Sequence, residues 1–151
     1  MLKAMRILAV DYGESRTGLA ISDYTGTIAT PLTVIHEKNF NALIKKIAIA
    51  AEENDATEIV VGNPINMNGS KGEKSIKCEL LAEKLRSCVS LPVEMWDERL
   101  TTVAAHDIIS ENNPRSESRN KRRQTIDAIA AAVILEGYLG YKGNRVGIKS
   151  D

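Results

Sequence analysis

The chain has 151 residues, of which 43% are hydrophobic and 26% are charged, and its formal net charge is zero. These values are typical of a globular domain that is long enough to bury one sizeable core. The longest uninterrupted apolar run, residues 128–135, is far shorter than the ~20 residues of a membrane span, so we expect no membrane contact. One domain is predicted over residues 1–140, followed by a loosely ordered tail over residues 141–151.

Basic residues and cysteines suggest where the protein works and what it contacts. Residues 115–123 carry five basic side chains and one acidic side chain, whereas residues 1–114 carry 12 basic and 16 acidic side chains. One concentrated basic segment in a neutral chain favours a local contact with an anion. Cys78 and Cys88 form no paired metal motif, and the first residues have no signal-peptide pattern, so reduced thiols and a cytoplasmic location are expected.

The first third of the chain alternates apolar runs with turn residues. This pattern predicts three strands, over residues 6–10, 17–22 and 28–35. Short turns between them favour an antiparallel meander. Pro31 cannot donate to a ladder of hydrogen bonds, so the third strand is placed at an edge of the sheet.

The apolar period then becomes helical. Helices are predicted over residues 40–54, 73–88, 101–112 and 124–139. Asn39 is expected to cap the first of them. The residues available for the inner face of the second helix are Ile76, Leu80, Leu81, Ala82 and Leu85.

Two further apolar runs complete the predicted fold. They indicate buried strands over residues 58–62 and 92–96, which right-handed crossovers through the helices make parallel. The result is an α/β fold with a five-stranded mixed sheet, in which the first three strands are antiparallel and the last two are parallel, with helices on its faces. Residues 113–123, which include a proline and are rich in serine, asparagine and basic residues, are predicted as a loop.

Acidic residues stand at three points that this fold could bring together. Asp11 ends the first strand, Asp97 and Glu98 end the fifth, and Asp127 is expected in the first turn of the last helix. Because neighbouring side chains of a strand point to opposite faces, only one of Asp97 and Glu98 can face the others, and alternation alone does not say which.

The last helix presents Asp127 on a face of small residues. Ala130, Ala131 and Ile134 follow it at helical spacing, so this face can approach the sheet closely and direct Asp127 inward. Each acid also has an ordinary interpretation. Asp11 could form a turn beside Gly13, and acids near a helix start are common.

Converging carboxylates repel one another, and hard divalent cations relieve that repulsion through oxygen ligands. Two such ions, roughly 3.5–4 Å apart, cleave phosphodiesters without a histidine or cysteine nucleophile. The chain has two histidines and no nucleophile motif. We therefore predict a nuclease that uses Mg²⁺ or Mn²⁺, with two ions at the acids.

Basic residues near the acids are candidates for substrate contact. Arg16 and Arg99 could clamp the nucleic-acid backbone, or they could balance the acids as structural ion pairs. The basic loop offers further candidates for phosphate contact, unless it is only a solvated loop. These candidates are Arg119, Lys121, Arg122 and Arg123.

Four blocks of sequence occur in a fixed order. They are Asp11-Tyr12-Gly13 with Arg16-Thr17-Gly18-Leu19-Ala20, then Val60-Val61-Gly62 with Pro64, then Asp97-Glu98-Arg99-Leu100-Thr101-Thr102, and then Asp127-Ala128-Ile129-Ala130-Ala131. This order resembles the YqgF (RuvX) family over residues 5–139. The resemblance implies a ribonuclease H-like fold and a nuclease that matures the 5′ end of pre-16S ribosomal RNA.

The resemblance also assigns roles to residues. Asp11, Glu98 and Asp127 match the metal-binding, catalytic acids, with Glu98 preferred to Asp97. Two residues depart from the pattern: Ser15 stands where a basic residue is expected, and Asn63 where an apolar residue is expected.

Several functions remain open at this point. The same site could resolve Holliday junctions, so the expected partner is structured RNA or branched DNA, with the protein acting as a monomer or homodimer. An ATP-binding relative of actin and the sugar kinases, and a non-catalytic RNA-binding ribosome-assembly factor, are the alternatives of other classes.

Overall fold

The computed structural model describes residues 4–101 and 119–149, with side chains described over 4–101 and 126–143. Its elements are β1 (Ile7–Asp11), β2 (Arg16–Ser22), β3 (Ala29–His36), α1 (Phe40–Glu53), β4 (Glu58–Asn63), α2 (Glu73–Cys88), β5 (Val93–Asp97), the 3-10 helix η1 (Glu98–Leu100) and α4 (Arg119–Lys149). The helix predicted over residues 101–112 falls almost wholly outside the described residues. No described helix is long and apolar enough to cross a membrane.

The five strands form one mixed sheet in the order β3-β2-β1-β4-β5. β2 is antiparallel to β1 and to β3, whereas β4 is parallel to β1 and to β5. This topology confirms the predicted meander and crossovers. β3 is an edge strand as predicted, and its pairing with β2 shifts register where Pro31 lies opposite Ala20.

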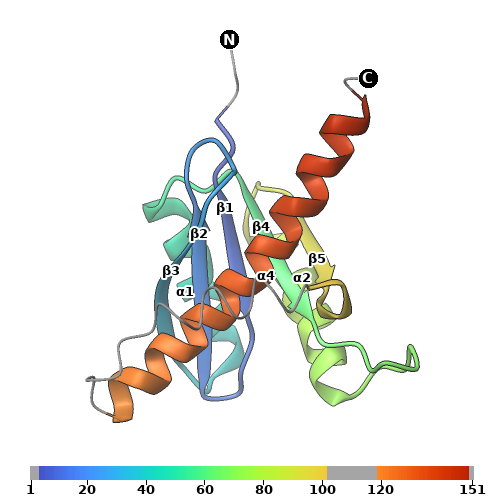
Figure 1. Cartoon of the computed structure of the whole chain (residues 1–151). Helices are drawn as coiled ribbons and strands as arrows, with labels where there is room; N and C mark the ends of the chain where they lie inside the picture. The colour runs from blue at the N-terminus through green and yellow to red at the C-terminus, as the bar shows by residue number, and fades with distance from the viewer. Residues whose placement is uncertain (1–3, 102–118, 150–151) are drawn as a thin grey trace.

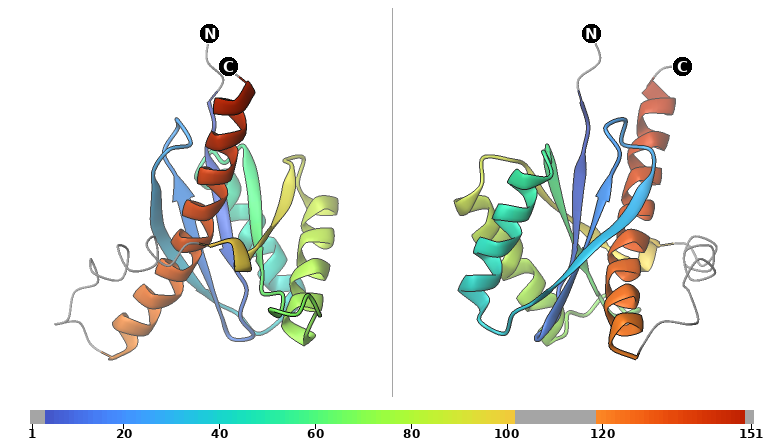
Figure 2. Two further views of the ribbon diagram at one scale, coloured as in Figure 1. Left: turned by 45° about the vertical axis from the view of Figure 1, so that its right-hand side comes forward. Right: turned by 90° about the vertical axis from the view of Figure 1, so that its left-hand side faces the viewer.

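Helices cover both faces of the sheet, as Figures 1 and 2 show: α4 crosses one face and α1 and α2 lie on the other. The alternation of β1 explains the two layers. Leu8 and Val10 belong to the core under α1 and α2, whereas Ile7 and Ala9 belong to the core under α4. All four side chains are fully buried, so β1 is the centre of the molecule.

The first two helices lie where they are predicted, and the inner face of α2 is predicted in part, because Leu81, Ala82 and Leu85 are buried. Asn39 caps α1 by accepting a hydrogen bond from the backbone N–H of Ala42 at 2.9 Å. Ile76 and Leu80, expected inside, are 57% and 40% exposed. Ser75 takes an inner position instead, because its hydroxyl donates to Asn63 Oδ1 at 2.5 Å at the end of β4.

The last helix is longer than predicted. Because α4 begins at Arg119, residues 119–123 are helical and not part of a loop, and Asp127 lies beyond the first turn. Arginine and lysine are good helix formers, and each added residue contributes one hydrogen bond to a helix already nucleated. At its other end α4 continues to Lys149, past the predicted end at residue 139. The loose order of residues 141–151 stays a prediction.

Candidate active site

The parallel strands end together at one edge of the sheet. Asp11, Asn63 and Asp97 are the last residues of β1, β4 and β5, and Asn63 pairs directly with Asp97. Sites in open α/β sheets commonly lie outside the carboxyl ends of such strands. We call this end of the sheet, with Asp11, Glu98 and Asp127, the acid edge.

A glycine brings Asp127 to the acid edge. Gly18 pairs with Asp11 across β1 and β2, and a Cβ atom at Gly18 would overlap the backbone carbonyl of Asp127. Only a residue without a side chain lets the backbone of α4 rest on β2 at this point. Ala131 and Ile134 on the same helix face are buried, which confirms the predicted close approach of α4.

Glu98 reaches the acid edge from the turn after β5. It begins η1, and its Oε2 lies 3.2 Å from the position that a Cβ atom on Gly62 would take. Gly62 precedes the last residue of β4, so the Glu98 carboxylate lies over the end of β4. The absence of a side chain at Gly62 makes room for it.

The carboxylates at the acid edge influence one another through Asp11. Burial raises the pKa of Asp11, Lys74 counteracts this, and the charge of Asp127 raises it further. Burial and the charge of Asp11 raise the pKa of Glu98 to about 7, again against the effect of Lys74. Asp11 is therefore the acid that interacts with both of the others.

Lys74 is the functional candidate that sequence reasoning missed. It lies in the first turn of α2 and lines a hollow together with Asp11, Arg16 and Asp127. The only sequence signal for it is that α2 follows β4, but a loop over residues 64–72 separates the two, so the position of the first turn comes from the structure. Lys74 is the cation that acts on both Asp11 and Glu98.

The carboxylate of Asp127 has an ion-pair partner but lacks part of its hydrogen bonding. Arg16 Nε lies 3.0 Å from its Oδ2, with the two side chains 39% and 24% exposed. The same Oδ2 is buried and lacks a hydrogen bond of acceptable geometry from the described residues. Both observations hold, because the ion pair is close but its N–H does not point at the oxygen. The carboxylate of Asp127 therefore retains capacity to accept a further positive ligand.

Asp97 and Arg99 form a closed pair beside the acid edge. Arg99 Nη2 lies 2.7 Å from Asp97 Oδ2, and Arg99 Nε lies 3.0 Å from the same oxygen. The guanidinium lowers the pKa of Asp97, and the Asp97 carboxylate also caps η1. Asp97 thus lies at the start of η1, and Glu98 is the residue whose carboxylate interacts with Asp11. Whether these acids also begin the helix predicted over residues 101–112 stays a prediction, because that helix lies almost wholly outside the described residues.

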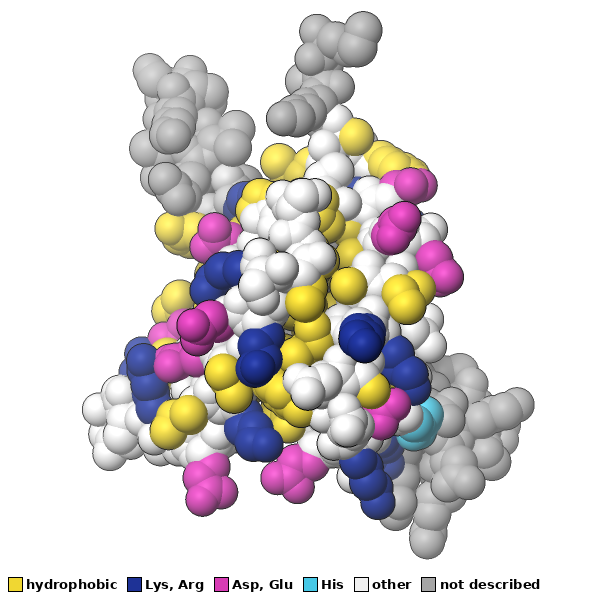
Figure 3. All heavy atoms as spheres, turned by 180° about the vertical axis from the view of Figure 1, so that it is seen from behind, with side chains coloured by type: hydrophobic (Ala, Val, Ile, Leu, Met, Phe, Trp, Pro, Cys, Tyr) yellow, Lys and Arg dark blue, Asp and Glu magenta, His cyan; other side chains and the backbone are white. Residues whose placement is uncertain are grey.

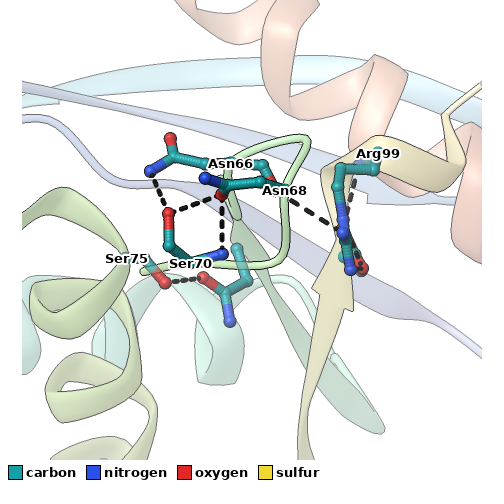
Figure 4. Close-up of polar contacts among 7 residues, drawn as sticks. Asn66, Asn68, Ser70, Ser75 and Arg99 are labelled. Atoms are coloured by element: carbon teal, nitrogen blue, oxygen red, sulfur yellow. Dashed lines mark hydrogen bonds and ion pairs between the residues drawn. The ribbon is translucent and has the colours of Figure 1, made fainter. Parts of the chain in front are cut away.

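The loop after β4 supports this pair, as Figure 4 shows. Asn66 donates to Ser70 Oγ at 3.0 Å, and Ser70 Oγ donates to Asn68 Oδ1 at 2.6 Å. Arg99 Nη1 lies 3.5 Å from the carbonyl oxygen of Asn66. The loop is therefore folded on itself and lies against Arg99, which makes Arg99 a structural cation here.

The acid edge offers oxygen ligands without yet forming a closed metal cage. No group of three acidic, histidine or cysteine side chains within the described ranges is arranged closely enough to hold an ion. The chemistry of the donors nevertheless suits hard divalent cations, because they are carboxylates whose mutual repulsion the protein does not fully offset. The side chains of Arg119, Lys121, Arg122 and Arg123 lie outside the described ones.

The matched family and two similar relatives are all described as nucleases. Residues 5–141 match the family RuvX, described as Holliday junction resolvase. A protein of Caldanaerobacter subterraneus subsp. tengcongensis named "Putative pre-16S rRNA nuclease" is 41% identical over 140 residues, which cover 93% of this chain and 99% of the relative. A protein of Clostridium novyi with the same name is 42% identical over 135 residues, covering 89% and 98%.

Solved structures share the fold at low sequence identity. Thermus thermophilus RuvC has a TM-score of 0.59 at 10% identity, covering 93% of this chain and 97% of RuvC. The yeast mitochondrial Holliday junction resolvase Ydc2 has a TM-score of 0.53 at 13% identity, covering 92% and 79%. The fold is therefore that of the RuvC-like, ribonuclease H-like nucleases, as predicted.

Proposed function

This chain belongs to the RuvX family and is a nuclease, and we propose that it is a metal-dependent enzyme that matures the 5′ end of pre-16S ribosomal RNA in the cytoplasm. The observation that carries the proposal is the convergence of Asp11, Glu98 and Asp127 from three separate elements on one edge of the sheet. The names of relatives that match almost the whole chain support ribosomal RNA as the substrate.

Asp11, Glu98 and Asp127 would hold the metal ions. Asp11 is the natural shared ligand, because its charge acts on Glu98 and the charge of Asp127 acts on it. When bound, a pair of Mg²⁺ or Mn²⁺ ions supplies an activated water and stabilises the leaving oxygen of the phosphodiester.

The remaining side chains prepare the acids for this task. Arg16 holds Asp127 against β2, so the helix carboxylate stays at the edge. Lys74 offsets part of the repulsion between Asp11 and Glu98. Arg99 engages Asp97, which keeps a fourth carboxylate from competing for the cations. The three acids can therefore remain close together before substrate arrives.

Resolution of Holliday junctions is the second candidate. The family description and the likeness to T. thermophilus RuvC in complex with a Holliday junction favour it, with a TM-score of 0.57 at 11% identity over 91% of this chain and 94% of that one. This function requires two symmetric cuts and therefore a homodimer, whereas RNA maturation is open to a monomer. Membership of the RuvX family argues against the actin-like alternative.

The test compares native protein with the Asp11→Asn variant on a pre-16S rRNA fragment and on a synthetic four-way DNA junction, with Mg²⁺ or Mn²⁺. We expect native protein to cut the RNA at its 5′ region and the variant to lose that activity while keeping its thermal transition. Cutting of the junction alone would favour the resolvase. RNA binding without cleavage by either protein would favour a non-catalytic assembly factor.

A further inference from the structure

Two hollows adjoin at the acid edge. The first contains the acids, and the second, which we call the lysine hollow, lies on the side of α1 and α2. The residues that line both hollows are Tyr12, Glu14 and Ser15. The lysine hollow is lined in addition by Lys38 and Lys77. The two hollows are therefore neighbours that share the turn between β1 and β2 as a common wall.

Among the eight lysines whose side chains are described, three form ion pairs and five do not, and the two lysines of the lysine hollow belong to the second group. Lys46, Lys71 and Lys142 each lie within 2.9 Å of a glutamate oxygen. Lys38 and Lys77 form no ion pair with any residue whose side chain is described, although the Lys77 ammonium lies 5.5 Å from the centre of the Phe40 ring. Their charges remain available to an external anion.

The two arginines that the sequence singled out for substrate contact are already engaged. Arg16 pairs with Asp127, and Arg99 pairs with Asp97. In the lysine hollow, by contrast, two lysines stand against the single carboxylate of Glu14. The side chains that line the lysine hollow therefore carry a net positive charge, whereas the acid hollow has three carboxylates against the two cations of Arg16 and Lys74.

Figure 3 shows the face of α1 and α2, on which lysine and arginine side chains gather over its middle and lower parts. The lower end of this view is the end at which β1 turns into β2, as Figure 1 shows. Basic side chains on this face therefore extend to the acid edge.

We propose that Lys38 and Lys77 bind a backbone phosphate of the substrate strand, next to the phosphate that is cleaved at the acid edge. The inference rests on the proposed nuclease function and adds a path to it: the strand runs from the acid hollow over Ser15 into the lysine hollow. Phosphate contacts of this kind fix the register of a nucleic acid without reading its sequence. The lysines are positioning residues, because they hold the strand while the acids act on it.

The test measures binding without cleavage, in the Asp11→Asn background. The dissociation constant for a labelled pre-16S rRNA fragment is measured over a series of salt concentrations, with and without Lys38→Ala and Lys77→Ala together. We expect the slope of log affinity against log salt to fall by roughly 0.7–0.9, which is the contribution of one phosphate contact. The matched control is Lys45→Ala with Lys84→Ala, which removes the same charge from α1 and α2 outside the lysine hollow. These changes should leave the slope within about 0.3 of the parent.

Each outcome has one meaning. An unchanged slope in the Lys38 and Lys77 variant, or an equal fall in the control, overturns the proposal in favour of general charge attraction. The same salt series on the four-way DNA junction shows whether RNA or DNA contacts the lysine hollow. Failure of the protein to bind either nucleic acid also overturns the proposal. If native protein leaves the RNA intact while the slope still falls as expected, the proposed function fails and the lysine hollow stands as a binding site.

Discussion

Carboxylates lie at both ends of the parallel strands, buried at one end and half-buried at the other, and the protein compensates their charges to different extents. At the start of β4, Glu58 is 9% exposed and accepts hydrogen bonds from the Tyr138 hydroxyl and, at 2.5 Å, from Lys142 Nζ. At the acid edge, Asp11 and Glu98 interact with each other and share the influence of Lys74. The charge of Glu58 is thus compensated by Tyr138 and Lys142, whereas the acid edge keeps an excess of negative charge.

This difference distinguishes a structural carboxylate, Glu58, from the carboxylates that we propose as metal ligands. Removing a charge from water is costly unless a partner compensates it. The fold provides such compensation for Glu58, and it provides less at the acid edge, where the pKa values of Asp11 and Glu98 are raised. Perturbed acids in a hollow are typical of functional sites. The following experiments test whether the distinction holds.

The largest expected effect is the difference in cleavage rate between variants of two neighbouring acids, Asp97 and Glu98. Glu98→Gln should lower the cleavage rate by more than about 100-fold, because it removes a proposed ligand outright. Asp97→Asn should lower it by less than about 10-fold, because Asp97 is engaged by Arg99 and acts on the site through the start of η1 and through its charge, which raises the pKa of Glu98. Initial rates on the same RNA at saturating Mg²⁺ measure both.

Equal losses in the two variants would contradict the assignment of Glu98 as the ligand. A larger loss in Asp97→Asn would reverse it. Thermal melting of each variant separates a local effect from unfolding.

The second experiment moves one acid without changing it. Gly18→Ala places a methyl group against the Asp127 backbone, so α4 must shift away from β2. We expect a loss of about 1–3 kcal/mol in stability, as for other overpacked sites, together with a fall in the cleavage rate. Urea unfolding and cleavage assays give the two values.

Gly140→Ala is the matched control, because a Cβ atom at Gly140 in α4 meets nothing within 4 Å. This variant should keep full activity and gain up to about 1 kcal/mol from helix propensity. Native-like cleavage by Gly18→Ala would show that Asp127 need not sit against β2.

The third experiment removes the ion pair between Lys142 and Glu58 at the other end of the sheet. Lys142→Met leaves Glu58 without its cation, although Lys142 is 31% exposed and solvent screens part of its charge. We expect a destabilisation of about 1–3 kcal/mol, below the cost of breaking a fully buried pair. Cleavage measured well below the melting temperature should stay unchanged. A loss of activity with an intact fold would mean that Glu58 and Lys142 also take part in substrate contact.

Much of the fold follows from local patterns in the sequence. The apolar runs of the strands, the helical spacing in α1 and the donor missing at Pro31 each act through nearby atoms, and each prediction is confirmed. The meeting of Asp11 with Asp127 was also predictable, because strand ends in a mixed sheet share an edge and a helix face of alanines packs closely.

The remaining features depend on contacts that no local pattern contains. On α2 the inner face includes Ser75, which donates to Asn63, whereas Ile76, expected there, is exposed. The role of Lys74 needed the position of a helix start relative to two strands. The choice between Asp97 and Glu98 depended on the turn into η1, which ends the alternation of β5.

The smallest expected effect is on stability in the absence of divalent ions. The pKa of Glu98 is raised to about 7, so the folded state favours its protonated form. The stability that this form contributes is complete below the ordinary glutamate pKa and is lost as the pH rises through about 7. Glu98 is half-exposed, so solvent screening leaves only about 1 kcal/mol of this effect. In EDTA, native protein should therefore melt about 2–4 °C lower at pH 8 than at pH 5, relative to Glu98→Gln, which carries no charge at either pH.

Glu94→Gln, an exposed change on β5, the strand that precedes Glu98, is the control for this measurement and should follow the native pH profile. Mg²⁺ added at pH 8 should raise the melting temperature of native protein more than that of Glu98→Gln, because the charged carboxylate is the form that a cation binds. If Glu98→Gln and native protein keep the same difference at both pH values, Glu98 is already compensated within the fold. The acid edge would then resemble the Glu58 end, and the contrast between the two ends would have to be drawn from Asp11 alone.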